Sequence, residues 1–116
     1  MTSDAPGIRS TDWLSLPDLA EALGEPVGRV RRLLDERHLI GSRRAGAFKV
    51  PAVFLVEGAP LASLRGTVIA LLDAGFTEDE AIDWLLATEA EIGMPPIDAL
   101  RAGRKSEVRR VARAQA

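Results

Sequence analysis

The sequence predicts a mainly α-helical fold, in which two short helices and a β-hairpin precede a small helical C-terminal domain. Two observations indicate this fold: apolar residues recur at helical spacing along most of the 116 residues, and glycines and prolines separate these stretches. Hydrophobic residues make up 47% of the chain. We therefore expect enough apolar side chains for a core and an ordered structure.

The first two helices are expected on either side of a tight turn at Gly24. Helical spacing gives the first helix an apolar stripe of Leu16, Leu19, Ala20 and Leu23. This helix opens near Ser15 or Leu16, and Gly24 allows the left-handed conformation that a tight exit needs. Pro26 suits the first turn of the second helix. The apolar stripe of the second helix consists of Val27, Val30, Leu33 and Leu34.

A short β-hairpin is expected between Gly41 and Pro51, with Ala45 and Gly46 near its tip. The next boundary lies at residues 58–60, where a glycine and a proline interrupt regular structure. The expected parts are a flexible N-terminal tail over residues 1–12, a unit of two helices and a hairpin over residues 13–58, and a helical C-terminal domain over residues 59–116.

The C-terminal domain is expected to contain four helical segments. The first has an apolar stripe from Leu61 to Leu72 and stops at Gly75. Thr77 and Glu80 have the spacing of a capping box, which predicts the start of the second segment. A short helical turn over residues 97–102 and a basic helix over residues 107–115 follow.

The composition excludes several kinds of chemistry. Cysteine is absent and histidine occurs once, so we expect no disulfide, no thiol nucleophile and no metal site, and a reducing compartment. No phosphate-binding loop, nucleophile elbow or metalloprotease motif occurs, so we expect no catalytic residues and no cofactor. The first residues lack a signal-peptide pattern, and no apolar run approaches the roughly 20 residues of a membrane span. We expect a cytoplasmic protein that is not an enzyme.

Charge is segregated along the chain, although the net charge is only −2. Between Pro26 and Val50 seven lysines and arginines stand against two acidic residues. From Asp73 to Asp98 every charged residue is acidic, and basic residues predominate again after position 100. Segregated charge, unlike net charge, creates a local field that attracts phosphates. We expect the acidic stretch to face away from a nucleic acid, or to dock against the basic last helix.

The spacing of Ala20, Gly24 and Val30 is typical of a helix-turn-helix. Crossing helices need a small residue where they approach, a glycine at the turn, and an aliphatic residue that packs the second helix onto the first. Glu25 departs from this pattern, which usually has an apolar residue there, and the second helix lacks a serine or threonine cap. Two-helix hairpins of purely structural purpose have similar spacing.

Basic residues on the second helix and on the hairpin are the candidate DNA contacts. If Val30 faces the core, the residues on or beside the exposed face of its helix are Gly28, Arg29, Arg31 and Arg32. Arginine binds phosphates and makes bidentate contacts to guanine in the major groove, while a glycine allows close approach of the DNA backbone. The hairpin adds Arg43, Arg44 and Lys49, as expected for a basic wing. Any one of these could be a solubilising surface residue, but together they predict a DNA interface.

These residues also resemble known proteins. Similarity to excisionase- and MerR-type winged helix-turn-helix modules rests on residues 16–24 (LPDLAEALG), 30–34 (VRRLL), 39–40, 43–44 and 50–51. A closer resemblance is to an actinobacterial family of small winged helix-turn-helix DNA-binding proteins with a helical C-terminal domain. It rests on residues 43–46 (RRAG), 50–54 (VPAVF), 84–85, 96–100 (PIDAL) and 113–115.

The resemblance to the actinobacterial family extends from about Leu14 to the C-terminus. It implies a sequence-specific DNA-binding protein, a transcriptional regulator that places a recognition helix in the major groove and a basic wing beside it. One mycobacterial member of that family is a Ser/Thr-kinase substrate, which implies a kinase acting on the N-terminal tail. The tail offers Thr2, Ser3, Ser10 and Thr11, although such residues are common in tails.

Two further questions stay open at this point. Residues 84–85, 92–103 and 107–108 are also similar to the toxin-binding C-terminal domain of certain bacterial antitoxins, so the alternative is an antitoxin-like protein that binds a toxin or another protein. The antitoxins that it resembles usually lack a wing, which argues against this alternative. The second question is whether the protein is a homodimer: one such module buries only about 600–1,000 Å² on double-stranded DNA and rarely binds tightly alone, but the sequence does not decide between monomer and dimer.

Overall fold

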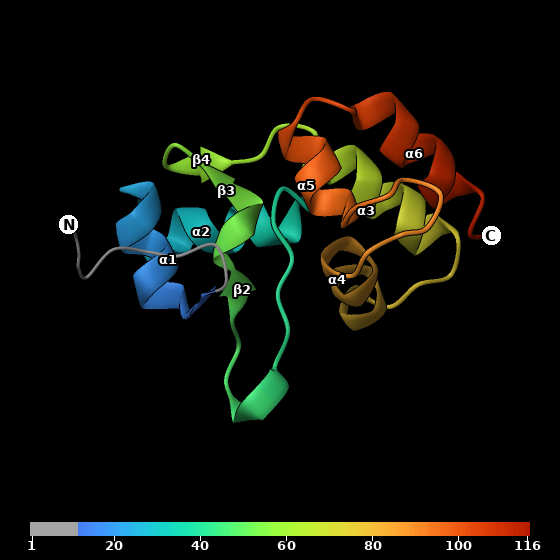
Figure 1. Ribbon diagram of the computed structural model, residues 1–116. Helices are drawn as coiled ribbons and strands as arrows, with labels where there is room; N and C mark the ends of the chain where they lie inside the picture. Colours follow the sequence, from blue (N-terminus) through green and yellow to red (C-terminus); the bar gives the residue numbers. More distant parts are fainter. Residues whose placement is uncertain (1–11) are drawn as a thin grey trace.

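The computed structural model describes residues 12–116, which form six α-helices and four short strands (Figure 1). The helices are α1 (Leu16–Leu23), α2 (Val27–Asp35), α3 (Leu64–Asp73), α4 (Glu78–Leu86), α5 (Pro96–Arg101) and α6 (Lys105–Arg113). The strands are β1 (Trp13–Leu14), β2 (Val50–Pro51), β3 (Leu55–Val56) and β4 (Ala59–Pro60). The expected mainly helical fold is confirmed.

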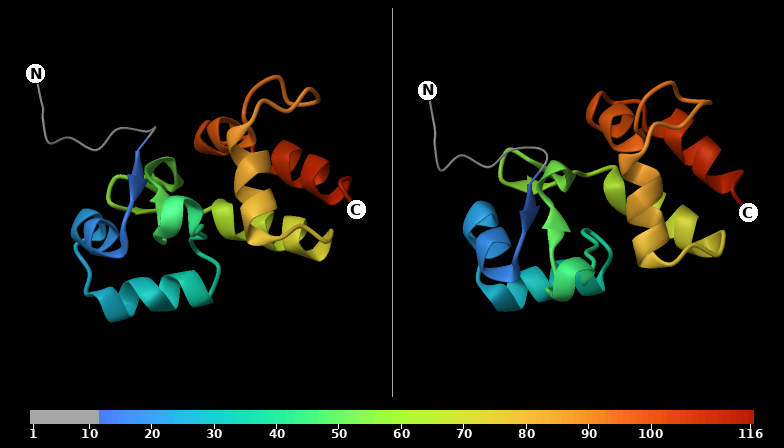
Figure 2. Two further views of the ribbon diagram at one scale, coloured as in Figure 1. Left: turned by 90° about the horizontal axis from the view of Figure 1, so that it is seen from below. Right: turned by 60° about the horizontal axis from the view of Figure 1, so that its bottom comes forward.

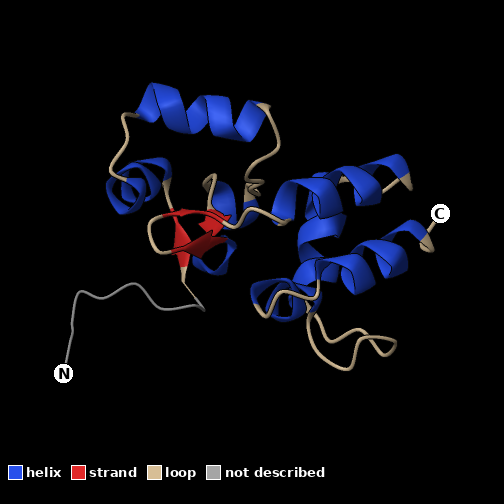
Figure 3. Ribbon diagram, turned by 90° about the horizontal axis from the view of Figure 1, so that it is seen from above, coloured by secondary structure: helices blue, strands red, loops and turns tan. Residues whose placement is uncertain are grey.

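The strands form two small antiparallel pairs. β1 pairs with β2, so that Trp13 lies opposite Pro51 and Leu14 opposite Val50, and β3 pairs with β4. Figure 3 shows the strands between α1 and α2 on one side and helices α3–α6 on the other. The expected boundary at residues 58–60 lies in the hairpin of β3 and β4, whose turn includes Gly58 with a φ of 77°.

Local signals fix α1 as the sequence predicts. The Ser15 hydroxyl accepts a hydrogen bond of 3.3 Å from the Asp18 amide, which satisfies one of the free N–H groups at the helix start. Gly24 ends α1 in the left-handed conformation, with φ 66° and ψ 32°. This turn leads directly to α2, and the predicted helix-turn-helix is confirmed.

Helix α2 differs from the prediction at its first turn. Pro26 is the N-cap residue instead of lying within the first turn, and no side chain caps the helix start. Val30 and Leu33 are buried as predicted, whereas Val27, which was expected in the same apolar stripe, is exposed. Val27 is the first residue of the helix and lies on the flank of the buried face, about 60° from Val30 at 100° per residue, so the core does not cover it.

The wing, residues 42–49, projects from the N-terminal half of the molecule (Figure 1). Its base is one bridge, in which Ser42 and Lys49 exchange backbone hydrogen bonds of 2.9 and 2.8 Å. A 3₁₀ turn from Arg44 to Gly46 forms the tip. The predicted hairpin is thus present but shorter, because its returning strand β2 pairs mainly with β1, which the sequence analysis did not predict.

The C-terminal half is built from α3–α6, which Figure 2 shows grouped beside the N-terminal half. Helix α6 packs against α3, and α5 contacts both α4 and α6. The capping box predicted at the start of α4 is present: Thr77 and Glu80 exchange hydrogen bonds of 2.9 and 3.1 Å. One cluster of buried apolar side chains extends through both halves and includes Leu19, Phe54, Leu71 and Leu85.

The expected tail, apart from Asp12, lies outside the described residues, and so do the threonines and serines proposed as kinase targets. None of the helices in residues 12–116 combines the length and the apolar character that crossing a membrane requires.

Candidate nucleic-acid interface

The outer face of α2 carries the predicted arginines. Val30 and Leu33 point into the core, so at 100° per residue the opposite face presents Gly28, Arg31 and Arg32, with Arg29 beside them. All four are exposed. Within residues 12–116, the side chains of the three arginines make no ion pair or hydrogen bond to the protein. Their positive charge is therefore available to an external partner.

The wing places its basic residues in two different environments. Arg43 is exposed, and its guanidinium lies 5.9 Å from the centre of the Phe48 ring, a cation–π distance that orients the side chain without neutralising it. Lys49 is half-buried at the wing base, where its backbone pairs with Ser42. Arg43 thus resembles the α2 arginines in having no carboxylate partner.

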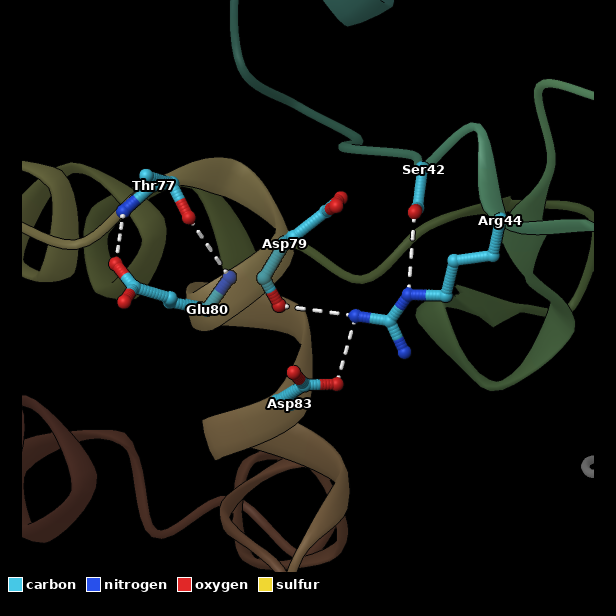
Figure 4. A network of polar contacts seen from close by, with 6 residues as sticks. All are labelled: Ser42, Arg44, Thr77, Asp79, Glu80 and Asp83. Carbon is cyan, nitrogen blue, oxygen red and sulfur yellow. Dashed lines mark hydrogen bonds and ion pairs between the residues drawn. The ribbon is translucent and has the colours of Figure 1, made fainter. Parts of the chain in front are cut away.

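Arg44 is held by the protein instead (Figure 4). Its Nε donates to the Ser42 hydroxyl at 3.1 Å, and its Nη2 donates to the Asp79 carbonyl at 3.0 Å and forms an ion pair with Asp83 at 2.7 Å. The guanidinium also lies 5.3 Å from the centre of the Trp13 ring. One side chain therefore joins the wing to the first turns of α4 and to β1.

Two further arginines join the end of α2 to the C-terminal half. Arg37, just after α2, pairs with the Glu78 carboxylate, and the Nε of Arg65 on α3 donates to the Glu36 carbonyl at 2.8 Å. Both partners of the Arg37 pair are more than 40% exposed, so the pair contributes at most about 1 kcal/mol to stability. What these contacts fix is the position of α2 and the wing relative to α3 and α4.

The acidic stretch was expected to face away from a nucleic acid or to dock against the basic last helix, and α4 of this stretch also contacts basic residues of the N-terminal half. Glu78 and Asp83 contact Arg37 and Arg44, which lie beside and on the wing. The sequence analysis did not predict this pairing. It gave no means to identify the partner segment, because that depends on how α4 packs against the N-terminal half.

A cavity of about 390 Å³ lies between α2, the wing and the start of α4. Its apolar lining includes Leu34, Ile40 and Phe48, and its charged lining consists of Arg31, Asp35, Arg37, Arg43 and Glu78. Three of the five charged groups are arginines: Arg31 on α2, Arg37 just after α2, and Arg43 on the wing. The cavity is thus bordered by α2 and the wing, the two elements that carry the predicted basic residues.

The comparisons with known proteins cover both halves of the chain. A family model described as "DNA-binding protein Rv2175c, wHTH domain" matches residues 8–55, and one described as "Rv2175c C-terminal domain of unknown function" matches residues 61–116. The "DNA-binding protein Rv2175c" of Mycobacterium tuberculosis (strain ATCC 25618 / H37Rv) is 36% identical over 114 residues, which cover 87% of this chain and 78% of the relative. The chain belongs to the Rv2175c family.

The solved structure of this family agrees with the fold described above. The NMR structure of Rv2175c superposes with a TM-score of 0.82 at 33% sequence identity, over 97% of this chain and 86% of that chain. The resemblance to an actinobacterial winged helix-turn-helix family with a helical C-terminal domain is therefore confirmed. Neither description of the Rv2175c family models mentions an enzymatic activity.

No group of three or more histidine or acidic side chains within residues 12–116 is arranged to hold a metal ion.

Proposed function

We propose that this protein binds double-stranded DNA in a sequence-specific manner and acts as a cytoplasmic transcriptional regulator. The observation that carries the proposal is the set of three arginines on the outer face of α2, none of which has a partner within the described chain. The similarity to a mycobacterial relative named as a DNA-binding protein supports it. Helix α2, the second helix of the helix-turn-helix, enters the major groove in this proposal.

The residues of α2 divide between the DNA backbone and the bases. Of the three arginines, Arg31 and Arg32 lie nearest the centre of the exposed face, where a bidentate contact to guanine O6 and N7 is worth about 1–3 kcal/mol of discrimination. Arg29 lies on the flank, where a phosphate contact fits better. Gly28 has open space around it, which lets the DNA backbone approach closely.

The wing residues take two roles. Arg43 and Lys49 meet phosphates, because no carboxylate neutralises them within residues 12–116. Arg44 supports the interface by holding the wing on α4, since Asp83 already compensates its charge. The proposed interface therefore consists of Gly28, Arg29, Arg31, Arg32, Arg43, Arg44 and Lys49. Residues 13–58 form the DNA-binding unit, and residues 59–116 form the helical domain that supports it.

The salt dependence of DNA affinity tests these roles. Affinity falls as salt rises, and each lost phosphate contact makes the slope of log affinity against log salt shallower by about 0.9. We expect Arg43→Ala to make the slope shallower by about that amount and Arg44→Ala to change it by less. Arg110→Ala is the matched control, because Arg110 is an exposed arginine on α6, away from α2 and the wing (Figure 1). Equal slopes for all four proteins would remove the wing from the interface.

Selection from a random duplex library tests sequence specificity. A protein that uses Arg31 or Arg32 to recognise guanine returns a consensus containing guanine, and Arg31→Ala or Arg32→Ala relaxes one position of it. A library that returns no consensus, while the salt-dependent affinity remains, would limit the function to non-specific DNA binding.

Two additional partners stay predictions: a second copy of the chain, and a Ser/Thr kinase that acts on residues 1–11. Sedimentation of the protein with and without duplex measures the first, and mass spectrometry of protein purified from its host measures the second.

A further inference from the structure

Val27 is the exposed large hydrophobic side chain of the described residues, with 37% of its surface accessible. The neighbouring apolar residues of the same helix, Val30 and Leu33, are 0% and 8% accessible. Leaving this fraction of a valine in water forgoes a corresponding part of the stabilisation that full burial would provide. The exposed position at the start of the recognition helix thus has an apolar side chain where a polar one would be better solvated.

The surroundings of Val27 limit what it can contact. The adjacent Glu25, Pro26 and Gly28 are exposed, and Arg31 lies one turn along the same side of α2. No other exposed large apolar side chain of residues 12–116 extends this spot into a patch. A protein interface needs a contiguous apolar area of several hundred Å², which a single valine does not supply. A partner that contacts Val27 alone would therefore have an apolar group of about the same small size.

The major groove of DNA offers one apolar group of that size, the C5-methyl of thymine. Residues at the N-terminal end of a recognition helix are those that contact base edges, and Val27 is the first residue of α2. Resting on the proposed function, we infer that Val27 packs against the C5-methyl group of a thymine in the binding site. Gly28, with no atom within 4 Å of the place of a Cβ, leaves the helix start free to approach that base.

This inference places the thymine beside the base that Arg31 contacts. Val27 and Arg31 are separated by four residues and lie about 40° apart around the helix axis, so their side chains face neighbouring base pairs. The binding site is expected to contain a thymine next to a guanine, on either strand.

Deoxyuridine substitution tests the contact, because uracil differs from thymine only by the missing methyl group. The duplex selected by the wild-type protein is prepared with deoxyuridine at each thymine in turn. We expect one position to weaken wild-type binding by about threefold to fivefold, the effect of one buried methyl group. Val27→Ala binds the unmodified duplex less tightly by a similar factor, and the deoxyuridine change has no further effect on it.

Val56→Ala is the matched control, since it removes the same two methyl groups from β3, and it is expected to respond to deoxyuridine as the wild type does. Three outcomes overturn the inference: a consensus without thymine, wild-type affinity that no deoxyuridine changes, or a deoxyuridine effect that Val27→Ala retains. The wild-type measurement does not depend on how any variant folds. Failure of the wild type to bind any duplex would instead contradict the proposed function itself.

Discussion

At position 28, the stability of the helix favours alanine, whereas the proposed DNA interface favours glycine. Gly28 is the second residue of α2, its φ is not positive, and no atom lies within 4 Å of where a Cβ would be. Nothing in the folded protein therefore requires glycine there, and glycine costs a helix free energy relative to alanine. In the proposed interface, the close approach of a DNA backbone would be the reason for a glycine at this position.

We predict that Gly28→Ala raises the free energy of unfolding by about 0.5–1 kcal/mol, because alanine restricts the unfolded chain more than glycine does. The same variant binds DNA roughly tenfold more weakly, because the added methyl group enters a tight contact. Urea unfolding and duplex titration measure the two effects. Ser106→Ala, on the exposed side of α6, is expected to leave DNA affinity unchanged. Unchanged affinity in Gly28→Ala would show that the open space is not used.

At the scale of the element, the wing depends on a close backbone contact at its root. Gly41 is buried, and a Cβ there would lie 2.7 Å from the Lys49 carbonyl oxygen and would overlap the Phe48 ring. The carbonyl belongs to the strand that returns from the wing tip, and its position is fixed by the hydrogen bond from the Ser42 amide. Any side chain at position 41 therefore has to push the two strands of the wing apart.

We predict that Gly41→Ala lowers the free energy of unfolding by about 1–3 kcal/mol, the usual cost of overpacking. DNA affinity falls as well, because Arg43 and Lys49 lose their fixed positions. Gly28→Ala is the natural comparison, since the same methyl group added there has the opposite effect on stability. Gly41→Ala with wild-type stability would mean that the wing root can shift without cost.

At the scale of the whole molecule, the C-terminal half neutralises part of the positive charge of the N-terminal half. Asp83 neutralises Arg44, and Glu78 neutralises Arg37, at the border between the wing and α4. The Arg44 pair is 38% and 65% exposed, so its contribution to stability is at most about 1 kcal/mol. In the proposed interface, the Arg44–Asp83 pair mainly lowers the number of phosphates that the wing can attract.

We predict that Asp83→Asn steepens the salt dependence of DNA binding by up to about 0.9 in the log–log slope, because Arg44 regains a free charge. Asp79→Asn removes the same charge from the same helix, but only the backbone carbonyl of Asp79 contacts Arg44, so its slope stays closer to that of the wild type. Both variants are compared over the same salt range. Identical slopes for the two would mean that Arg44 is not restrained by Asp83 when DNA binds.

The sequence predicted the parts of this fold that depend on neighbouring residues. The Ser15 cap, the Gly24 turn and the capping box of Thr77 and Glu80 are all local, and each lies where it was expected. The exposure of Val27 and the partners of Arg44 were missed. The exposure of Val27 depends on where the core ends, and the partners of Arg44 depend on how α4 packs against the wing. The periodic pattern of apolar residues gives no information about either.

The attachment of Arg44 to α4 also limits which segments of this protein can be exchanged with those of another protein. A chimaera that receives residues 13–58 without α4 would have Arg44 and Arg37 without their carboxylate partners, and its wing would lack the hydrogen bond to the Asp79 carbonyl. Arg44 and Asp83 therefore have to be kept together when parts of the protein are exchanged. An exchange of the proposed DNA-binding unit has to include the surface of α4 that contacts Arg44.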